Sequence, residues 1–226
     1  MTQTEARRDV FITGGTGFMG RRLIQSLAAC GHRVRALVRP GSESKLPPGC
    51  TAIPGDALDN SSYVAAVPPA DTFVQLVGIT HPNPSKAQEF RVVDMASAMA
   101  AIAAASRARV SHFVYVSVAQ PAPVMKAYVE ARAECERALR ASGLNATILR
   151  PWYVLGPGRR WPYLLLPMYW LLERIPSTRD AARRMGLVTV EQMVAALASA
   201  VEDPAQGIRI LEVPEIRAAR TVAKRV

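Results

Sequence analysis

The sequence predicts an α/β protein built on a doubly wound parallel sheet, and three features predict it. Short, nearly continuous apolar segments recur along the first 150 residues, which is typical of strands buried on both faces of a parallel sheet. Longer segments of helical character separate the later ones. A glycine-rich turn joins the first strand to the first helix. Because parallel neighbours need right-handed helical crossovers, this alternation indicates a doubly wound core.

Six strands are expected in this core, and two long helices lie between the later ones. The first strand begins at Val10 and runs into the glycines, and the others cover residues 33–38, 51–54, 72–77, 112–116 and 146–149. The two helices are expected over residues 88–108 and 127–141. We therefore assign residues 1–150 to one doubly wound core.

A small, mostly helical appendage is expected after the core, over residues 151–214. It opens with the Pro/Gly/aromatic segment RPWYVLGPGRRWP, which predicts a loop, and continues with a short apolar helix. A second helix over residues 189–201 opens with a capping box formed by Thr189 and Gln192. Residues 207–213 indicate a final strand, and the basic segment 215–226 is expected to be a frayed, solvated tail.

Three glycines stand three residues apart where the first strand gives way to a helix: Gly14, Gly17 and Gly20. In that setting the first glycine permits a tight turn, the second lets the backbone approach a pyrophosphate, and the third lets helix and strand pack closely. The N–H groups and the positive dipole end of the helix attract phosphates. The motif predicts nucleotide binding, with neighbouring contacts from Thr16, Phe18 and Met19.

The stretch TGGTGFMG resembles the TGxxGxxG fingerprint of short-chain dehydrogenase/reductases, specifically the extended and atypical branches that include NmrA-like and epimerase-like proteins. Further segments follow in the family's order: LVG, FVYVS, YVEAR, LRPWYVLGPG and RMGLVTVEQMVAAL. The resemblance implies that Asp56 meets the adenine, with Ala57 beside it, and that backbone after the fourth strand lines the cofactor. The remaining cofactor contacts expected are Leu76, Val77, Gly78 and Pro151, together with Tyr128 and Arg132, which could hydrogen-bond the nicotinamide ribose.

The end of the second strand predicts which nicotinamide cofactor is preferred, because it reaches the adenosine ribose. An acidic residue there would bind the ribose hydroxyls and repel a 2′-phosphate, but Arg39 stands at that end, with Ser42 and Lys45 close behind. A guanidinium can hold a phosphate through two hydrogen bonds. We therefore expect NADP rather than NAD, the alternative being that Arg39 is a solvated strand end.

The catalytic candidates are Tyr128, Arg132 and Ser117. Reductases of the resembled family pair a tyrosine with a lysine four residues later, which holds the nicotinamide ribose and helps the phenol transfer a proton. Here the pair is Tyr128 and Arg132, which share a helix face, although arginine is not equivalent to lysine. Ser117 aligns with the family's first serine, while Ala119 stands where the catalytic hydroxyl generally lies. The alternative is a half-buried Tyr128 and a solvated Arg132 paired with Glu136.

An aromatic segment is expected over the carboxyl ends of the strands, where open α/β sheets bind ligands. It suggests an apolar substrate, such as a quinone, a sterol-like or an isoprenoid compound, although closing the core is a simpler role. With Arg159, Arg160, Arg174 and the basic tail, it could also rest on an anionic membrane. Of the histidines, His81 lies nearest the expected nicotinamide, with loop surface as its expected role. The aromatic residues are Trp152, Tyr153, Trp161, Tyr163, Tyr169 and Trp170.

The composition limits the classes of partner that the chain is expected to bind. The net charge of +10 suits an anionic ligand or surface. The sequence lacks the interleaved basic and aromatic residues that would predict nucleic-acid binding. Cys30, Cys50 and Cys135 lack metal-ligand spacing, so neither a metal site nor a disulfide scaffold is expected. The few residues before the first strand leave no room for a signal peptide, and the apolar run at 161–172 is shorter than the roughly 20 residues that a bilayer crossing requires. We expect a cytoplasmic protein.

Two functions are compatible with these features. The first is an NADP-dependent oxidoreductase that acts on a small apolar carbonyl or quinone compound. The second is a non-catalytic NAD(P)-binding protein, similar to NmrA-like regulators or to the reductase-like accessory subunit of respiratory complex I. The complete glycine loop and Tyr128 favour the first, whereas Arg132 and Ala119 favour the second. The sequence does not indicate the oligomeric state.

Overall fold

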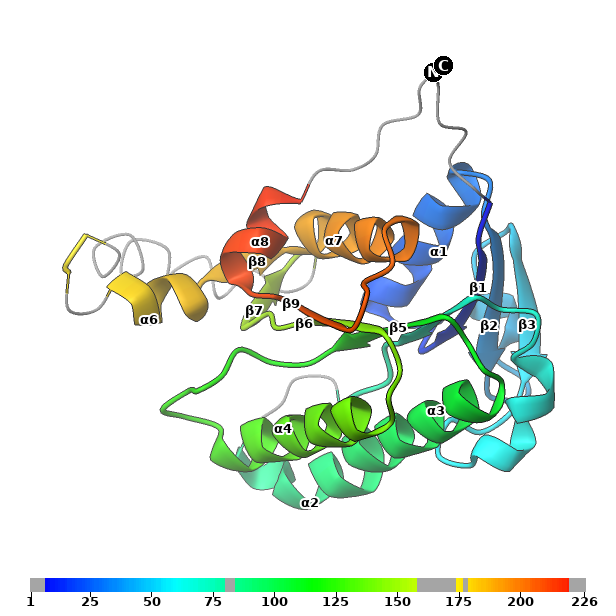
Figure 1. Ribbon diagram of the computed structural model, residues 1–226, viewed down its shortest axis with the longest axis horizontal. Helices are drawn as coiled ribbons and strands as arrows, with labels where there is room; N and C mark the ends of the chain where they lie inside the picture. Colours follow the sequence, from blue (N-terminus) through cyan, green and yellow to red (C-terminus); the bar gives the residue numbers. More distant parts are fainter. Residues whose placement is uncertain (1–6, 80–83, 158–173, 177–178, 220–226) are drawn as a thin grey trace.

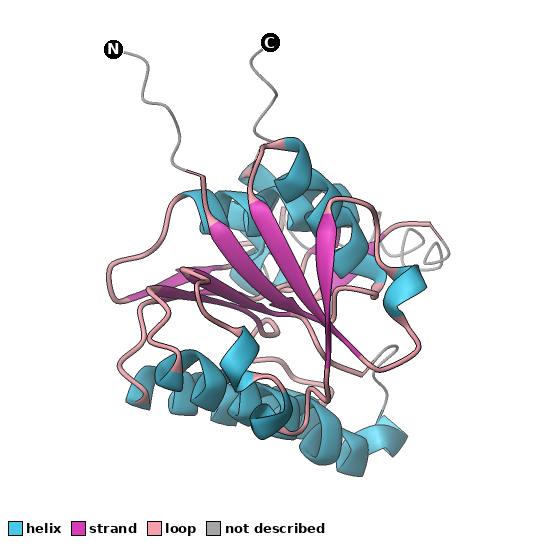
Figure 2. Cartoon of the chain, turned by 90° about the vertical axis from the view of Figure 1, so that its right-hand side faces the viewer, coloured by secondary structure: helices cyan, strands magenta, loops and turns pink. Residues whose placement is uncertain are grey.

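The computed structural model describes residues 7–79, 84–157, 174–176 and 179–219. Within them, seven parallel strands form one sheet in the order β3-β2-β1-β4-β5-β6-β9, between two layers of helices (Figure 1, Figure 2). This is the doubly wound arrangement, and the predicted fold class is confirmed. The strands are β1 (Asp9–Thr13), β2 (Arg33–Val38), β3 (Cys50–Pro54), β4 (Thr72–Gln75), β5 (His112–Val116), β6 (Ala146–Leu149) and β9 (Ile208–Leu211).

One helical layer lies above the sheet in Figure 1 and consists of α1 (Phe18–Ala29), α7 (Val190–Glu202) and α8 (Val213–Ala218). The other layer lies below the sheet. It contains α4 (Lys126–Ala141) and a continuous helical segment made of α2 (Ala87–Glu89), the π-helical turn η5 (Phe90–Met95) and α3 (Ala96–Arg107). Short 3₁₀ turns occupy Glu43–Lys45 (η1), Asn60–Ser62 (η2), Val64–Ala66 (η3) and Pro84–Lys86 (η4), and α6 covers Arg179–Arg184.

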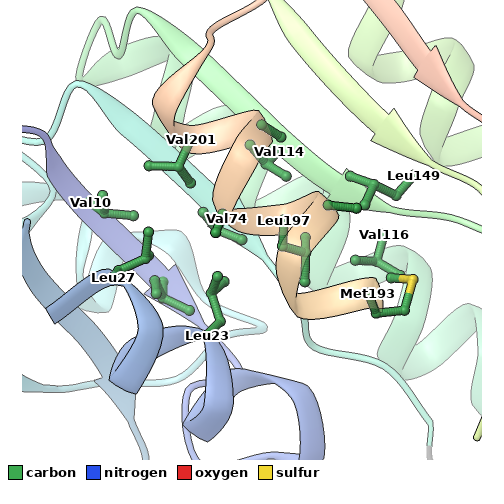
Figure 3. Packing of buried hydrophobic residues seen from close by; sticks show 14 of the residues in the cluster. Val10, Leu23, Leu27, Val74, Val114, Val116, Leu149, Met193, Leu197 and Val201 are labelled. Atoms are coloured by element: carbon green, nitrogen blue, oxygen red, sulfur yellow. The ribbon is translucent and has the colours of Figure 1, made fainter. Parts of the chain in front are cut away.

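Alternation along the strands divides the core into two clusters. In β1, Val10 and Ile12 pack in the cluster beneath α1 and α7, whereas Phe11 belongs to the cluster against α3 and α4. Figure 3 shows the first cluster, to which Leu23 of α1 and Leu197 of α7 both belong. The central strands β1, β4, β5 and β6 are thus buried on both faces, as their near-continuous apolar sequences predicted, whereas the edge strands β3 and β9 are only partly buried.

The expected strand and helix positions agree with the structure to within a few residues. The largest difference in the core concerns the strand expected over residues 72–77, because β4 ends at Gln75. The following residues, 76–78, are therefore loop. The capping box of α7 is confirmed: the Thr189 hydroxyl accepts from the Gln192 amide, and the Gln192 side chain accepts from the Thr189 amide.

Two expectations for the C-terminal part are wrong. Residues 153–155 were expected in a loop but form β7 (Tyr153–Leu155), which pairs in parallel with β8 (Leu187–Thr189). That partner is 34 residues away, so local sequence could not indicate it. The segment from Glu215 is not frayed at its start, because residues 215–218 belong to α8. A second capping box, between Glu212 and Glu215, and the burial of Ile216 hold this helix in place.

Candidate dinucleotide site

A cavity of about 780 Å³ opens where the glycine loop, the ends of the central strands and the start of α4 meet. It lies at the carboxyl ends of the parallel strands, the usual ligand position in open α/β sheets. The structure brings all of the sequence-predicted site residues to its wall: Gly14, Thr16, Gly17, Phe18, Met19, Gly20, Arg39, Asp56, Ala57, Leu76, Val77, Gly78, Ser117, Tyr128, Arg132 and Pro151.

The glycine loop is built so tightly that side chains cannot replace its glycines without distortion. Gly14 has a φ of +73°, and a Cβ there would stand 2.8 Å from the carbonyl carbon of Leu76. At Gly20 a Cβ would stand 2.8 Å from the Cα of Gly15. The Gly17 amide donates to the Gly14 carbonyl over 3.0 Å and closes the turn. The loop therefore places bare backbone against the cavity, as a bound pyrophosphate requires.

The start of α1 provides the matching electrostatics. Gly17 is the N-cap, no side chain caps the helix, and its first turn contains no acidic residue. Phe18, Met19 and Gly20 of that turn line the cavity. The positive end of the helix dipole is therefore presented to a ligand, and this arrangement fits a dinucleotide diphosphate.

Arg39 and Asp56 lie at the end of the cavity that β2 and β3 form. Arg39 is exposed, and its guanidinium makes no hydrogen bond or ion pair with another side chain of the described residues. Asp56 accepts a 3.0 Å hydrogen bond from the Leu58 amide through Oδ1, which orients the carboxylate. The guanidinium can therefore turn toward an anionic group on a ligand, and the carboxylate can accept from an amino group.

At the other end of the cavity, Tyr128 and Arg132 face it from α4. Tyr128 is half-buried and its ring lies 4.9 Å from that of Phe90. Tyr128 is thus half-buried near a helix start, as the alternative expected, but the Arg132 guanidinium is not solvated and does not pair with Glu136, so the part of the alternative that concerns Arg132 is wrong. Its Nη1 donates to the Val116 carbonyl over 2.9 Å and to the Tyr115 hydroxyl over 3.2 Å. Glu136 pairs instead with Arg150, over 2.6 Å.

Sequence reasoning missed Asp94, which pairs with Nη2 of Arg132. Asp94 lies in the π-helical turn η5, has no exposed surface and accepts the Ile79 amide over 3.1 Å. Burial acts against the charge of Arg132, but Tyr115, Tyr128 and Asp94 outweigh it and hold the pKa of Arg132 well above its ordinary value. Arg132 is therefore a fixed, charged group turned into the protein.

Ser117 is also engaged within the protein. Its hydroxyl is buried and donates to Glu136 Oε1 over 2.6 Å, and Gln120 donates to the same oxygen over 2.6 Å. Arg150 completes the group by bridging Glu136 and Glu212. This network joins the end of β5 to α4 and to the start of α8.

The wall on the α4 side is mostly apolar. It includes Ile79, Val93, Val118 and Met125, which sequence reasoning did not select, together with Trp152 and Tyr153 of the predicted aromatic segment. Exposed Val92 and Val124 lie in η5 and just before α4. His81 and the aromatic residues 161–170 lie outside the described residues.

No helix within the described ranges combines the length and apolarity needed to cross a bilayer. In the same ranges, no three His, Cys, Asp or Glu side chains are grouped to hold a metal ion.

Comparisons with known proteins agree with this site. The model of a family described as NAD(P)H-binding matches residues 14–160. A ceramide reductase of Caulobacter vibrioides is 30% identical over 219 residues, which are 95% of this chain and 67% of the relative. A 3-diazoavenalumate denitrifying reductase of Streptomyces is 29% identical over 88% of this chain and 73% of its own.

The fold also matches a solved structure, that of the Bordetella bronchiseptica enzyme WbmH in complex with NAD+. The TM-score is 0.68 at 20% identity, and the match covers 92% of this chain and 76% of WbmH. At that identity the likeness shows the Rossmann fold alone.

Proposed function

The chain belongs to the NAD(P)H-binding family, and we propose that it is an NADP-dependent oxidoreductase which reduces a small apolar carbonyl or quinone compound. One observation carries the proposal: the glycine loop and the Tyr128 side chain line the same cavity, beside an apolar wall. A reductase needs a hydride donor and a proton donor on either side of one substrate position.

In this proposal the loop and the start of α1 bind the diphosphate, and Asp56 accepts from the adenine amino group. Arg39 binds the 2′-phosphate, since its guanidinium has no side-chain partner among the described residues. When bound, the reduced nicotinamide supplies a hydride. Tyr128 donates the proton to the substrate oxygen, and the apolar wall excludes water from that position.

The apolar wall also supports the class of substrate. In the described part of the cavity, the cations are Arg39 at the far end and Arg132, which is already paired with Asp94. An anionic substrate would therefore find little to neutralise it near Tyr128, whereas an uncharged, apolar molecule gains from burial. A relative named for ceramide, a lipid, agrees with this class.

A non-catalytic, NAD(P)-binding role is the second candidate, and two observations favour it. The Arg132 guanidinium is hydrogen-bonded into the protein. The Ser117 hydroxyl donates to Glu136. Neither group is poised to polarise a substrate carbonyl, so under this second candidate the bound cofactor would stabilise a surface for a partner.

NADPH oxidation by the purified protein, measured with a panel of apolar carbonyl and quinone compounds, separates the two candidates. We expect turnover, and we expect Tyr128→Phe to lower kcat about 10²- to 10⁴-fold with unchanged NADPH affinity. Tyr63→Phe is the matched control, because the Tyr63 hydroxyl is buried away from the cavity wall. Absence of turnover across the panel, with the cofactor bound, would leave the non-catalytic role.

A further inference from the structure

Asp94 and Arg132 form a buried ion pair beneath the loop that follows β4. The Asp94 side chain has no exposed surface, and that of Arg132 is 7% exposed. One Asp94 oxygen pairs with Arg132, and the other accepts the Ile79 amide over 3.1 Å. A Cβ at Gly78 would collide with Arg132 and stand 3.0 Å from Asp94. The pair therefore occupies the space that this glycine leaves free.

The geometry suits arginine and not lysine. From one planar group, Arg132 reaches the Val116 carbonyl, the Tyr115 hydroxyl and Asp94 at the same time. A lysine ammonium is a compact point charge on a flexible stem and does not match this fork. An unpaired charge at this depth would be strongly unfavourable, so the Asp94 carboxylate and the Arg132 guanidinium each need the other as a partner.

The same guanidinium lies against the candidate proton donor. The Cζ atom of Arg132 is 5.2 Å from the centre of the Tyr128 ring. A lone cation at that distance would stabilise the phenolate, and at an effective dielectric constant of about 20 its full effect corresponds to about two pH units. The Asp94 carboxylate, which pairs with Nη2 of the same guanidinium, opposes this field.

We propose that Asp94 is a positioning residue, which fixes the Arg132 guanidinium inward and neutralises its charge beside Tyr128, so that Tyr128 keeps its proton for delivery to the substrate. The role given to Tyr128 rests on the proposed reductase function. The neutralisation itself rests only on the ion pair, and it is measurable without cofactor or substrate.

Other titratable groups around the pair do not supply a competing charge. Tyr115 on β5 and Cys135 on α4 contact this cluster, and burial raises the pKa of each above its ordinary value. Both therefore stay neutral in the working pH range. On the η5 side the titratable groups are Asp94 itself and Arg91, which is exposed so that solvent screens its charge, and Phe90 of the same turn packs against the Tyr128 ring. In the described loop after β4, Gly78 and Ile79 carry no charge.

Spectrophotometric titration of the tyrosine phenols in the cofactor-free protein tests the proposal. The chain contains six tyrosines. For each protein, the curve of the same protein with Tyr128→Phe is subtracted, which leaves the ionisation of Tyr128. We expect Asp94→Asn to move the Tyr128 ionisation about one pH unit lower than in the native protein. Asp94→Asn/Arg132→Met, which removes both charges, should return it to the native position.

Glu136→Gln is the matched control. It also removes a buried carboxylate that pairs with an arginine, but Arg150 follows β6 rather than lying over the Tyr128 ring. This variant should lose stability and leave the Tyr128 ionisation in place. If the protein oxidises NADPH, its rate should fall at alkaline pH as Tyr128 ionises. That fall should move to lower pH in Asp94→Asn, by the same amount as the Tyr128 ionisation, and should not move in Glu136→Gln.

An Asp94→Asn titration identical to the native one would overturn the proposal, as would a double variant that stays shifted. If Asp94→Asn does not fold and the double variant does, the unneutralised charge is the cause, which supports the proposal; if neither folds, Asp94 serves the fold independently of charge and the proposal is wrong. If the native protein does not oxidise NADPH but Asp94→Asn still shifts the Tyr128 ionisation, the reductase function is refuted and the proposed neutralisation stands.

Discussion

Substituting Gly20 by alanine tests the glycine loop directly. A Cβ at this position would stand 2.8 Å from the Gly15 Cα and 3.0 Å from the Gly14 carbonyl carbon, both of them backbone atoms that cannot turn aside. The loop must therefore shift, which costs about 1–3 kcal/mol, while alanine returns about 1 kcal/mol of helix propensity. The net loss of stability should be at most about 2 kcal/mol.

The free energy of cofactor binding should change more than the free energy of unfolding. Displacing the loop removes one or two amide–phosphate hydrogen bonds, each worth about 1.5–3 kcal/mol, so NADPH should bind roughly 10- to 25,000-fold more weakly. Isothermal titration calorimetry measures this loss. Gly186→Ala is the control. Its Cβ would also crowd a neighbour, the Arg217 side chain, but neither residue lines the cavity. An unchanged dissociation constant in a folded Gly20→Ala protein would refute the assigned role of the loop.

Three further predictions concern other parts of the molecule. Arg39→Ala should weaken NADPH binding about 10- to 150-fold by loss of a charge-assisted phosphate contact and leave NADH binding unchanged; an equal change for both coenzymes would exclude a 2′-phosphate contact. Burial, helped by Arg209, lowers the pKa of His112 to about 4 from 6.5, so the unfolded chain takes up a proton first as the pH falls. Stability should therefore drop by about 2 kcal/mol between pH 7.5 and pH 5, and His112→Gln should remove that part of the pH dependence in urea unfolding. Thr189→Ala removes the hydroxyl that caps α7 and should lower stability by about 1 kcal/mol, seen as a fall in Tm of about 2–4 °C; an unchanged Tm would show that the cap contributes nothing.

Much of the fold was predictable because its signals are local. Each core strand is a short apolar run, and the turn at Gly14 to Gly20 has a spacing that phosphate binding itself requires. The pairing of β7 with β8 was not predictable, because its hydrogen bonds join segments 34 residues apart. The start of α8 was missed for a related reason: Val213 and Ile216 are buried against distant helices.

The same distinction applies to the candidate site. Residues at strand ends and in the loop follow from order along the chain, whereas the partner of Arg132 depends on how η5 packs against α4. Asp94 stands in the segment FRVVDM and resembles an ordinary exposed helix residue. The available signal was a pair of facts taken together: a carboxylate among apolar residues, and an arginine where the resembled reductases have lysine.

Binding of a pyridine dinucleotide at the glycine loop is the central claim, and calorimetric titration of the native protein with NADPH and NADH tests it most directly. We expect saturable binding of one dinucleotide per chain, tighter for NADPH. At about 100 times its dissociation constant the ligand should add about 2.7 kcal/mol to the stability and raise Tm by several degrees. No binding heat and an unmoved Tm with both coenzymes would contradict the account.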